Sequence, residues 1–383
     1  MEDELAVIDR QLIRLVRRRI ELLERLHVQA REARRPLYRP KHLRSITERL
    51  RRTAAEYRLP WALVDRIFSL TVDESFQRHL ARAHPIGRVE EPRVTVAIVG
   101  GTGGMGRLFA KLIGRRGHRV LIVNEHTELT PPQAAARADL TLIAVPISVT
   151  PQVIRQVGPA LRPGSCLTDV TSLKSNALRA MLQATNPRVD VIGTHPMFGP
   201  TVESLLRQLV VLCPGRGRRW LPRLKRLLEG EGAVVRVVDP EEHDKHMAVI
   251  QVLRHFVTFA TGKCLEELQV DIQESLRFTS PIYRLELAMI GRLFAQDPAL
   301  YADIELENQY SAQVLATFLH VASQLTTAVV SRDSDAFVRY FRSTARYLGS
   351  FCEEAMEESN YLVSRLVERM NRCEGGGPEE EQG

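Results

Sequence analysis

A glycine-rich turn and a single histidine are the features of this chain best suited to chemistry. The run Val96–Arg107 (VAIVGGTGGMGR) is a short apolar strand that breaks into glycines and restarts as a helix. Farther along, Thr194–Pro200 (THPMFGP) holds one histidine in a proline- and glycine-rich loop just after a predicted strand. Parallel sheets bind their ligands at the carboxyl ends of the strands. The two segments together therefore indicate a nucleotide-dependent dehydrogenase.

The cofactor prediction depends on the spacing Gly101-x-Gly103-x-x-Gly106 between a strand and a helix. The first glycine permits the tight turn, the second lets the backbone approach a pyrophosphate, and the third lets the helix pack on the strand. Amides at the helix N-terminus then bind the phosphates. Thr102 and Met105 occupy variable positions of the motif and are predicted to contact the same cofactor.

The end of the second strand predicts which dinucleotide is bound. An acidic residue there binds the ribose hydroxyls of NAD, about 20 residues beyond the glycines. Glu125 has this spacing, and Asn124 is the alternative occupant of the position. Since no arginine follows immediately to bind a 2′-phosphate, we predict NAD.

Composition excludes several other classes of protein. The 383 residues are 44% apolar, which suits two or three globular domains. No run approaches the roughly 20 apolar residues of a membrane span. The five cysteines lack CxxC spacing, so neither a metal site nor a disulfide framework is predicted. The acidic start Met1–Glu4 has no apolar signal core, which predicts a cytoplasmic protein.

Basic residues are concentrated at the start of the chain. Residues 1–90 contain 20 Lys and Arg against 13 Asp and Glu, whereas the remainder contains 33 of each. The basic segment lacks interleaved aromatic residues and any DNA-reading motif, so we predict no nucleic-acid partner. Solvated arginines on helix faces explain most of the excess, and a small polyanionic ligand is the remaining alternative.

Three helices are predicted before residue 88, over 5–33, 42–57 and 60–83. The first has an apolar seam at spacings of three and four, comprising Leu5, Ile8, Leu12, Leu15, Leu22 and Leu26. Arg19 occupies the missing step, where it could reach a ligand, extend to solvent or pair with an internal carboxylate. Helices of such unequal length do not close a core alone, so we predict pairing with a second copy.

Alternating strands and helices over residues 93–242 predict a mainly parallel, doubly wound sheet. The predicted strands are 94–99, 119–123, 138–146, 165–170, 189–193, 209–213 and 233–238. Residues 243–373 are predicted to be helical, and the polar tail 374–383 to be disordered. The fold class is therefore α/β plus all-α, with a helical domain over 1–88.

Five segments strongly resemble prephenate dehydrogenase. They are 100–109 (GGTGGMGRLF), 169–174 (DVTSLK), 195–200 (HPMFGP), 253–256 (LRHF) and 280–298 (SPIYRLELAMIGRLFAQDP). With the short helical domain in front, the order resembles the bifunctional chorismate mutase–prephenate dehydrogenase family of enteric bacteria. The resemblance covers roughly residues 5–370. It implies a chorismate-mutase-like three-helix domain, a Rossmann dinucleotide-binding domain and a C-terminal helical dimerisation domain, assembled as a homodimer.

The resemblance implies oxidative decarboxylation of prephenate to 4-hydroxyphenylpyruvate, with reduction of NAD, in tyrosine biosynthesis. Hydride leaves the ring carbon that bears the hydroxyl, so that hydroxyl must lose its proton. A neutral His195 can accept it, and Ser172 matches the family serine that orients the histidine and the hydroxyl. Ser172 could instead cap the helix that follows it. Aromatisation drives the loss of carbon dioxide, so no metal is required.

Four further residues are assigned by the same resemblance. Arg292 matches the arginine that binds the ring carboxylate through its planar fork. Arg284 lies near the same helical face, where it either assists or forms a structural salt bridge. Lys174 supports the junction of cofactor and substrate, with a surface lysine as the alternative. His255 matches a position associated with ligand discrimination and tyrosine feedback, with core packing as the alternative.

The N-terminal domain departs from the family at most catalytic positions. Arg19 and Ser75 match mutase-pocket positions. Five other positions do not match. Glu2 and His42 each stand where the family has an arginine, and Ala30 stands where it has the catalytic lysine. Leu43 replaces the catalytic glutamate, and His79 replaces a late Gln or Glu. Chorismate is a dianion, and its rearrangement develops negative charge on the ether oxygen, so lost cations weaken catalysis. We predict absent or very weak mutase activity.

Two alternative functions remain. The protein could be fully bifunctional, if neighbouring arginines (Arg31, Arg34 or Arg35) substitute or if the true start lies upstream. A cofactor-sensing regulatory protein without turnover would require the catalytic histidine or the carboxylate-binding arginine to be missing, and both are present. Use of arogenate and the strength of tyrosine inhibition are left open by the sequence.

Overall fold

The computed structural model describes residues 1–32, 40–83, 92–202 and 204–374. The chain divides into two compact units. The first holds the N-terminal helices and the sheet. The second holds Asp239–Gly383 together with two short segments, Pro146–Pro151 and Thr171–Ala177, which follow sheet strands. The tail predicted from residue 374 lies outside the described residues from 375 onward, as does most of the linker before residue 92.

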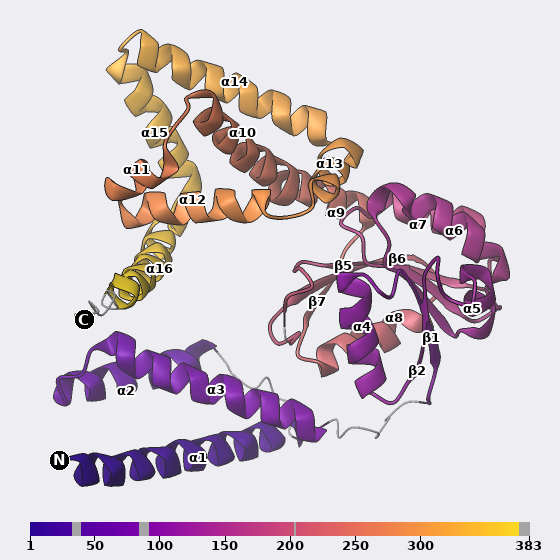
Figure 1. Cartoon of the computed structure of the whole chain (residues 1–383), viewed down its shortest axis with the longest axis horizontal. Coiled ribbons are helices and arrows are strands. Elements are labelled where there is room, and N and C mark those ends of the chain that lie inside the picture. Colours follow the sequence, from indigo (N-terminus) through magenta and orange to yellow (C-terminus); the bar gives the residue numbers. More distant parts are fainter. Residues whose placement is uncertain (33–39, 84–91, 203, 375–383) are drawn as a thin grey trace, which may run out of the picture. The chain divides into compact units, whose positions relative to one another are not determined.

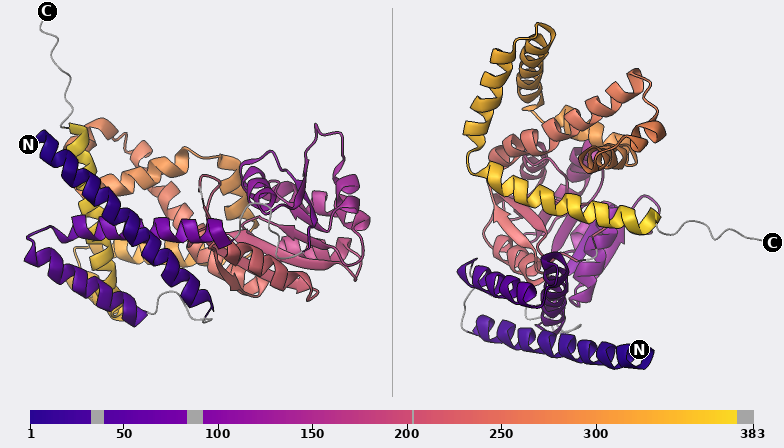
Figure 2. Two further views of the ribbon diagram at one scale, coloured as in Figure 1. Left: turned by 90° about the horizontal axis from the view of Figure 1, so that it is seen from below. Right: turned by 90° about the vertical axis from the view of Figure 1, so that its left-hand side faces the viewer.

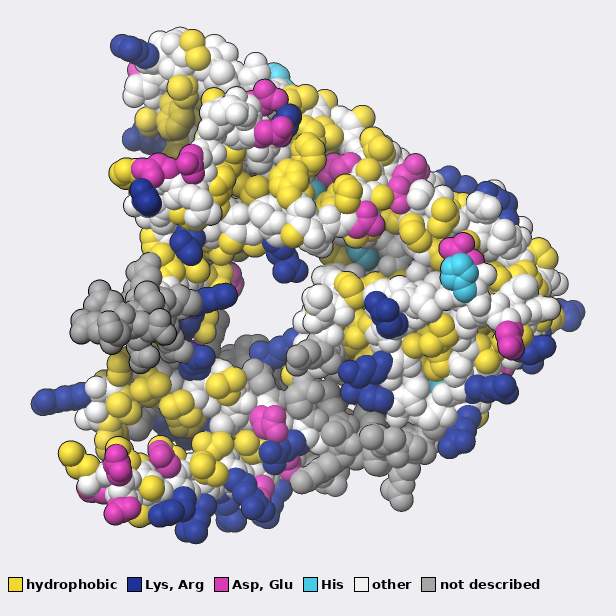
Figure 3. Space-filling view, viewed as in Figure 1, with side chains coloured by type: hydrophobic (Ala, Val, Ile, Leu, Met, Phe, Trp, Pro, Cys, Tyr) yellow, Lys and Arg dark blue, Asp and Glu magenta, His cyan; other side chains and the backbone are white. Residues whose placement is uncertain are grey.

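The three predicted N-terminal helices are confirmed as α1 (Glu2–Glu32), α2 (Pro40–Glu56) and α3 (Trp61–Ala83) (Figures 1 and 2). Both α1 and α2 pack against α3, burying Ile20 and Val64 among others. The seam of α1 is not covered. All six of its predicted apolar residues are exposed, from 44% for Ile8 to 66% for Leu15. Apolar and basic side chains share the surface of these helices (Figure 3).

A seven-stranded sheet forms the body of the first unit, in the order β2-β1-β3-β4-β5-β6-β7. The strands are β1 (Thr95–Val99), β2 (Arg119–Val123), β3 (Leu140–Ile143), β4 (Cys166–Asp169), β5 (Asp190–Pro196), β6 (Leu209–Arg216) and β7 (Val234–Val237). All neighbours are parallel except β5 and β6, which are antiparallel. The mainly parallel sheet predicted from the sequence is confirmed, with β6 and β7 reversed.

Helices cover both faces of the sheet (Figures 1 and 2). On one face α4 (Gly104–Arg115) and α8 (Trp220–Gly230) pack over a core that includes Val96 and Ile98. On the other face α5 (Pro131–Arg137) packs over Ala97. Because side chains alternate along β1, these residues point to opposite faces, and the doubly wound architecture follows.

The second unit is helical. Its elements are α9 (Pro240–Met247), the π-helical η3 (Ala248–Leu253), α10 (Arg254–Glu267), α11 (Ile272–Arg277), α12 (Pro281–Phe294), α13 (Pro298–Glu307), α14 (Ser311–Val330), α15 (Ser334–Leu348) and α16 (Phe351–Glu374). Helix α10 lies against α12, and η3 contacts α9, α13 and α14.

Helix α14 corrects one expectation. By length and composition it could cross a membrane, although the sequence was expected to contain no such segment. Only 6% of its most apolar window is buried. It nevertheless contacts η3, α13 and α15. A single helix of this kind is weak evidence for a membrane location.

Candidate active site

The glycine turn joins β1 to α4 in the geometry that a dinucleotide requires. The Gly100 amide donates to the Val123 carbonyl at 2.8 Å, and the Gly103 amide donates to the Gly100 carbonyl at 3.0 Å. Gly100 has a φ of +84°, a conformation that favours glycine. Helix α4 begins at Gly104, so its free amides face the turn.

The glycines of the motif are required by close backbone approach. A Cβ on Gly106 would overlap the Gly100 carbonyl oxygen and lie 2.6 Å from the Gly101 Cα. A Cβ on Gly101 would lie 2.8 Å from Cγ2 of Ile122. Thr102 and Gly103 are exposed on the turn, and Met105 is partly buried against the core. The turn therefore has the open backbone that a pyrophosphate needs.

A cavity of about 700 Å³ opens beside the start of α4. Its lining includes Gly104, Arg107 and Lys111 of the helix, and Pro200 of the loop after β5. The two cations lie within the first two turns of the helix, so this surface attracts anions.

Asn124 and Glu125 are the two candidates for the predicted ribose-binding position. Asn124 directly follows β2, and its amide donates to Oγ1 of Thr102 at 3.3 Å. Glu125 is one residue farther along and is exposed. The contact with the glycine turn therefore comes from Asn124, the alternative that the sequence had left open.

The sequence had indicated that His195 lies in a loop just after a strand. In the structure it lies within β5 itself. Strand β5 continues to Pro196 because β6 pairs with it antiparallel, with His195 opposite Val211. The histidine is only 2% exposed. The adjacent Thr194 amide donates to the carboxylate of Asp169, at the end of β4. Since β1, β3, β4 and β5 are parallel, His195 lies at the same edge of the sheet as the glycine turn.

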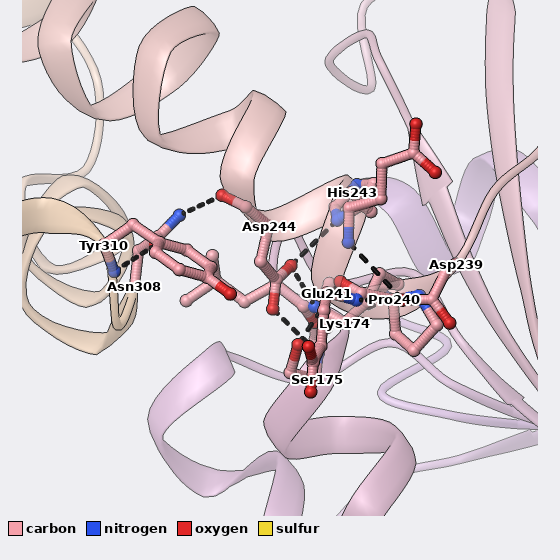
Figure 4. Close-up of polar contacts among 12 residues, drawn as sticks. Lys174, Ser175, Asp239, Pro240, Glu241, His243, Asp244, Asn308 and Tyr310 are labelled. Carbon is pink, nitrogen blue, oxygen red and sulfur yellow. Dashed lines mark hydrogen bonds and ion pairs between the residues drawn. The ribbon is translucent and has the colours of Figure 1, made fainter. Parts of the chain in front are cut away.

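Lys174 is fully buried in the second unit, which rules out the surface alternative (Figure 4). The backbone amides of Lys174 and Ser175 donate to the two oxygens of Asp244, at 2.9 and 2.8 Å. Burial acts to raise the pKa of Asp244, but hydrogen bonds from His243, Ser175 and the Lys174 backbone outweigh it and lower the pKa. Asp244 thus fixes the 171–177 segment, in which Ser172 is partly buried, to α9.

Arg292 and Arg284 lie two turns apart on α12. Arg292 is exposed and Arg284 is partly buried. Within the described parts of the chain neither guanidinium forms an ion pair, so the salt-bridge alternative for Arg284 finds no support there. Burial raises the pKa of Tyr301, and the positive charge of Arg292 opposes this rise. Arg292 therefore acts electrostatically on α13.

His255 is half-buried on α10. Its ring meets Tyr301 edge-on, with centroids 4.8 Å apart. Burial, and secondly the charge of Arg254, lower its pKa, so the imidazole is neutral near pH 7. Its Nδ1 atom is buried without a hydrogen-bond partner among the described residues. Simple core packing would not leave this atom unpaired.

The predicted site residues fall in two groups. The glycine turn and His195 belong to the first unit. Ser172, Lys174, His255, Arg284 and Arg292 belong to the second. Sequence reasoning gave no role to Asp169, Asp244 or Glu305, although Asp169 is the first residue of the 169–174 segment that carries part of the resemblance. Among the described residues no cluster of His, Cys, Asp and Glu could hold a metal ion.

The two matched mutase-pocket residues are used within the N-terminal helices. Arg19 donates to the hydroxyl of Thr71 and to the Phe68 carbonyl, and its guanidinium lies 4.5 Å from the Phe68 ring centre. Ser75 is fully buried and donates to the Val72 carbonyl at 2.7 Å. Both therefore stabilise α3 and its packing on α1. The side chains of Ala30, His42, Leu43 and His79 lie outside the described residues.

Comparison with known proteins matches three families along the chain. Residues 1–80 match chorismate mutase type II, residues 116–237 the nucleotide-binding domain of prephenate dehydrogenase, and residues 239–343 its dimerization domain. The second match begins after the glycine turn, so the cofactor motif rests on its own geometry.

Relatives match three quarters or more of the chain. The T-protein of Enterobacter agglomerans is 34% identical, covering 95% of this chain and 96% of that one. A probable arogenate/prephenate dehydrogenase of Methanocaldococcus jannaschii is 36% identical, covering 75% and 69%. The structure of Aquifex aeolicus prephenate dehydrogenase with hydroxyphenyl propionate and NAD⁺ has a TM-score of 0.55 at 22% identity, covering 67% and 98%. That structural likeness concerns the fold.

Proposed function

The chain belongs to the family of bifunctional chorismate mutase–prephenate dehydrogenases, and from this premise we propose which of its residues carry out the reaction. The protein is an NAD-dependent prephenate dehydrogenase, which converts prephenate to 4-hydroxyphenylpyruvate and carbon dioxide. We propose His195 as the proton acceptor. Its burial at the sheet edge that also carries the glycine turn is the observation that supports this role.

The dinucleotide would be held by Gly101, Thr102, Gly103, Met105 and Gly106. The overlap that a Cβ would cause at two of these glycines supports this assignment. When bound, NAD supplies the acceptor for the hydride. Near the ribose, Asn124 joins or replaces Glu125, because it is the residue that reaches Thr102.

The imidazole of His195 accepts the proton of the ring hydroxyl as negative charge develops on that oxygen. Ser172 orients the hydroxyl, and Lys174 positions the segment that carries it. Arg292 binds the ring carboxylate that is lost as carbon dioxide, with Arg284 assisting on the same helix. The absence of an ion pair at either guanidinium within the described chain supports this reading, since a dianion needs available cations.

We propose that the mutase segment is inactive or very weak. Its two matched pocket residues are engaged inside the helices, by Thr71 and Phe68 for Arg19 and by Val72 for Ser75. The fully bifunctional alternative predicts conversion of chorismate. The deciding experiment follows NADH formation at 340 nm from prephenate and, separately, from chorismate. We expect a strong signal from prephenate and little from chorismate; no signal from prephenate would refute the dehydrogenase assignment.

We further propose a cytoplasmic homodimer that tyrosine inhibits. The uncovered seam of α1, including Leu12 and Leu15, supports self-association, because exposed apolar stripes of this length are costly in water. The dimerization-domain match over 239–343 supports a second contact region. Light scattering after size exclusion tests the dimer, and inhibition of NADH formation by L-tyrosine tests the feedback.

A further inference from the structure

A second cavity, of about 330 Å³, lies in the first unit at the edge of the sheet opposite to the glycine turn. Its lining includes Val94, Asp139 and Ser165, which directly precede β1, β3 and β4. These three strands are parallel, so the cavity lies at their amino ends. The glycine turn follows β1 and therefore lies at the carboxyl ends. The cavity is thus separate from the dinucleotide and prephenate sites.

Positive charge dominates the lining of this cavity. Its charged residues are four arginines and one acid, Asp139, which leaves an excess of three positive charges. The arginines come from the residues before β1, the residues before β4 and the start of α8, and they are Arg93, Arg162, Arg219 and Arg223. Cations that converge from separate segments on one concave surface attract multiply charged anions.

The single acid of the lining is already occupied by the fold. One carboxylate oxygen of Asp139 accepts from the Thr95 amide at 2.8 Å, and the other accepts from Nη2 of Arg162 at 3.0 Å. The same nitrogen of Arg162 also donates to the Ala138 carbonyl at 3.0 Å. Asp139 and Arg162 therefore neutralise each other, and the positive excess comes from the remaining three arginines.

Arg219 extends its guanidinium across the cavity. A Cβ on Gly164 would lie 3.3 Å from Nη1 of Arg219, so the guanidinium lies close above this glycine of the lining. Among the described residues neither Arg219 nor Arg93 forms an ion pair. The nearby carboxylate of Asp190 accepts from the backbone amides of Arg219 and Trp220, each at 2.9 Å, and so caps the start of α8.

Trp220 fixes the fourth arginine but offers little surface to a ligand. The guanidinium of Arg223 lies 4.7 Å from the Trp220 ring centre, a cation–π contact that holds it at the cavity. Trp220 is only 4% exposed, and its ring nitrogen donates to the Gly164 carbonyl at 3.0 Å. An aromatic ligand therefore finds no free ring to stack on, and recognition must depend on charge.

We propose that this cavity binds a small polyanion through two linked phosphoryl groups. Guanidinium groups bind phosphate oxygens in pairs through their planar fork. A phosphate group carries about −1.5 to −2 charges at neutral pH, so two of them balance the excess of three positive charges. The volume lies at the small end of the range for small-molecule sites, about 300–1,000 Å³. A single exposed ion pair is weak, so binding requires several of the arginines together.

The test is calorimetric titration of the full chain with NAD at saturation, so that the glycine turn is occupied. The probes are inorganic pyrophosphate, ATP and orthophosphate. We expect a pyrophosphate Kd below about 1 mM, and at least about tenfold weaker binding of orthophosphate. Tighter binding of ATP would identify a nucleotide as the source of the two phosphoryl groups, whereas equal binding would identify pyrophosphate itself. A pyrophosphate Kd above about 1 mM would overturn the proposal.

Substitutions locate the binding at this cavity. The double variant Arg93→Ala/Arg219→Ala should weaken pyrophosphate binding about tenfold or more, because two cations are lost. Arg219→Lys keeps the charge without the fork and should cause a smaller loss. The matched control is Arg218→Ala, an exposed arginine outside the lining, which should change the Kd by less than about twofold.

The dehydrogenase reaction provides an independent readout. NADH formation from prephenate should be unchanged in all of these variants, because none of the substituted residues belongs to the proposed catalytic or cofactor site. Unchanged pyrophosphate binding in the double variant, or an equal loss in Arg218→Ala, would overturn the site while leaving the dehydrogenase assignment intact.

Discussion

Replacing Glu305 by glutamine should stabilise the protein above neutral pH and have little effect in acid. Burial raises the pKa of this carboxyl from 4.5 to about 7. Between these values the folded state binds a proton that the unfolded chain has released. The carboxyl therefore contributes fully to stability below pH 4.5, and that contribution is lost as the pH rises through 7. Glutamine is neutral throughout and avoids the loss.

The magnitude follows from the two pKa values. A rise from 4.5 to about 7 corresponds to about 3 kcal/mol at full weight. Because the side chain is only partly buried, solvent screening reduces the expected gain to about 1–2 kcal/mol. For a unit of this size that is a rise in Tm of about 3–6 °C at pH 8.

The assay is thermal unfolding of the unmodified protein, Glu305→Gln and Glu307→Gln at pH 5 and pH 8. We expect a gain for Glu305→Gln at pH 8, of which only a small part persists at pH 5, and no change for the exposed control. A loss of Tm at pH 8 would refute the reasoning, because it would mean that the carboxylate has a stabilising partner. An equal gain at both pH values would show that burial of the charge is not the cause.

Three further substitutions test the site. His195→Asn should lower kcat for prephenate about a hundredfold or more, with NAD binding by fluorescence titration little changed; weak NAD binding with normal kcat would contradict its role. Arg292→Ala should chiefly raise the KM for prephenate, by about tenfold or more. Steady-state kinetics measures this, and a lower kcat with an unchanged KM would contradict a role in substrate binding. Gly106→Ala should abolish tight NAD binding through backbone overlap, whereas Gly114→Ala, which meets no atom within 4 Å, should leave the NAD Kd unchanged.

Local patterns sufficed to predict most elements. Each predicted strand is present, because runs such as 94–99 and 119–123 combine continuous apolar character with glycine- or proline-rich ends. The N-terminal helices are predicted by unbroken periodicity between prolines. The glycine turn is predictable for the same reason, since its conformation is set by residues adjacent in the chain.

The position of His195 could not be predicted locally. Its strand extends past Gly193 only because β6, which follows in the chain, returns antiparallel beside it. No residue near His195 encodes that pairing, and the following prolines resemble a loop. The reversal of β6 and β7 within the sheet is invisible for the same reason: strand patterns carry no direction.

The burial of charged side chains could not be predicted from the sequence either. Lys174 and Glu305 are types of residue that usually lie in solvent. Lys174 is buried because its backbone is fixed by Asp244, which is distant in the chain. Glu305 is partly buried because α13 packs on η3. The sequence around Lys174 and Glu305 gives no sign of these packing partners, so their burial is visible only in the folded structure.

In the N-terminal helices Arg19, which matches a mutase-pocket position, is bound by neighbouring residues, whereas the apolar seam of α1 is uncovered. This combination favours self-association over mutase catalysis. Arg19 would be the cation best placed for an anionic ligand, yet Thr71 and Phe68 engage its guanidinium on α3. Releasing it would cost these hydrogen bonds and the aromatic contact. The seam residues on α1, by contrast, are exposed, and covering them with another apolar surface lowers the free energy. We expect a second copy of the helix to cover the seam without disturbing Arg19, and such pairing would require no mutase activity.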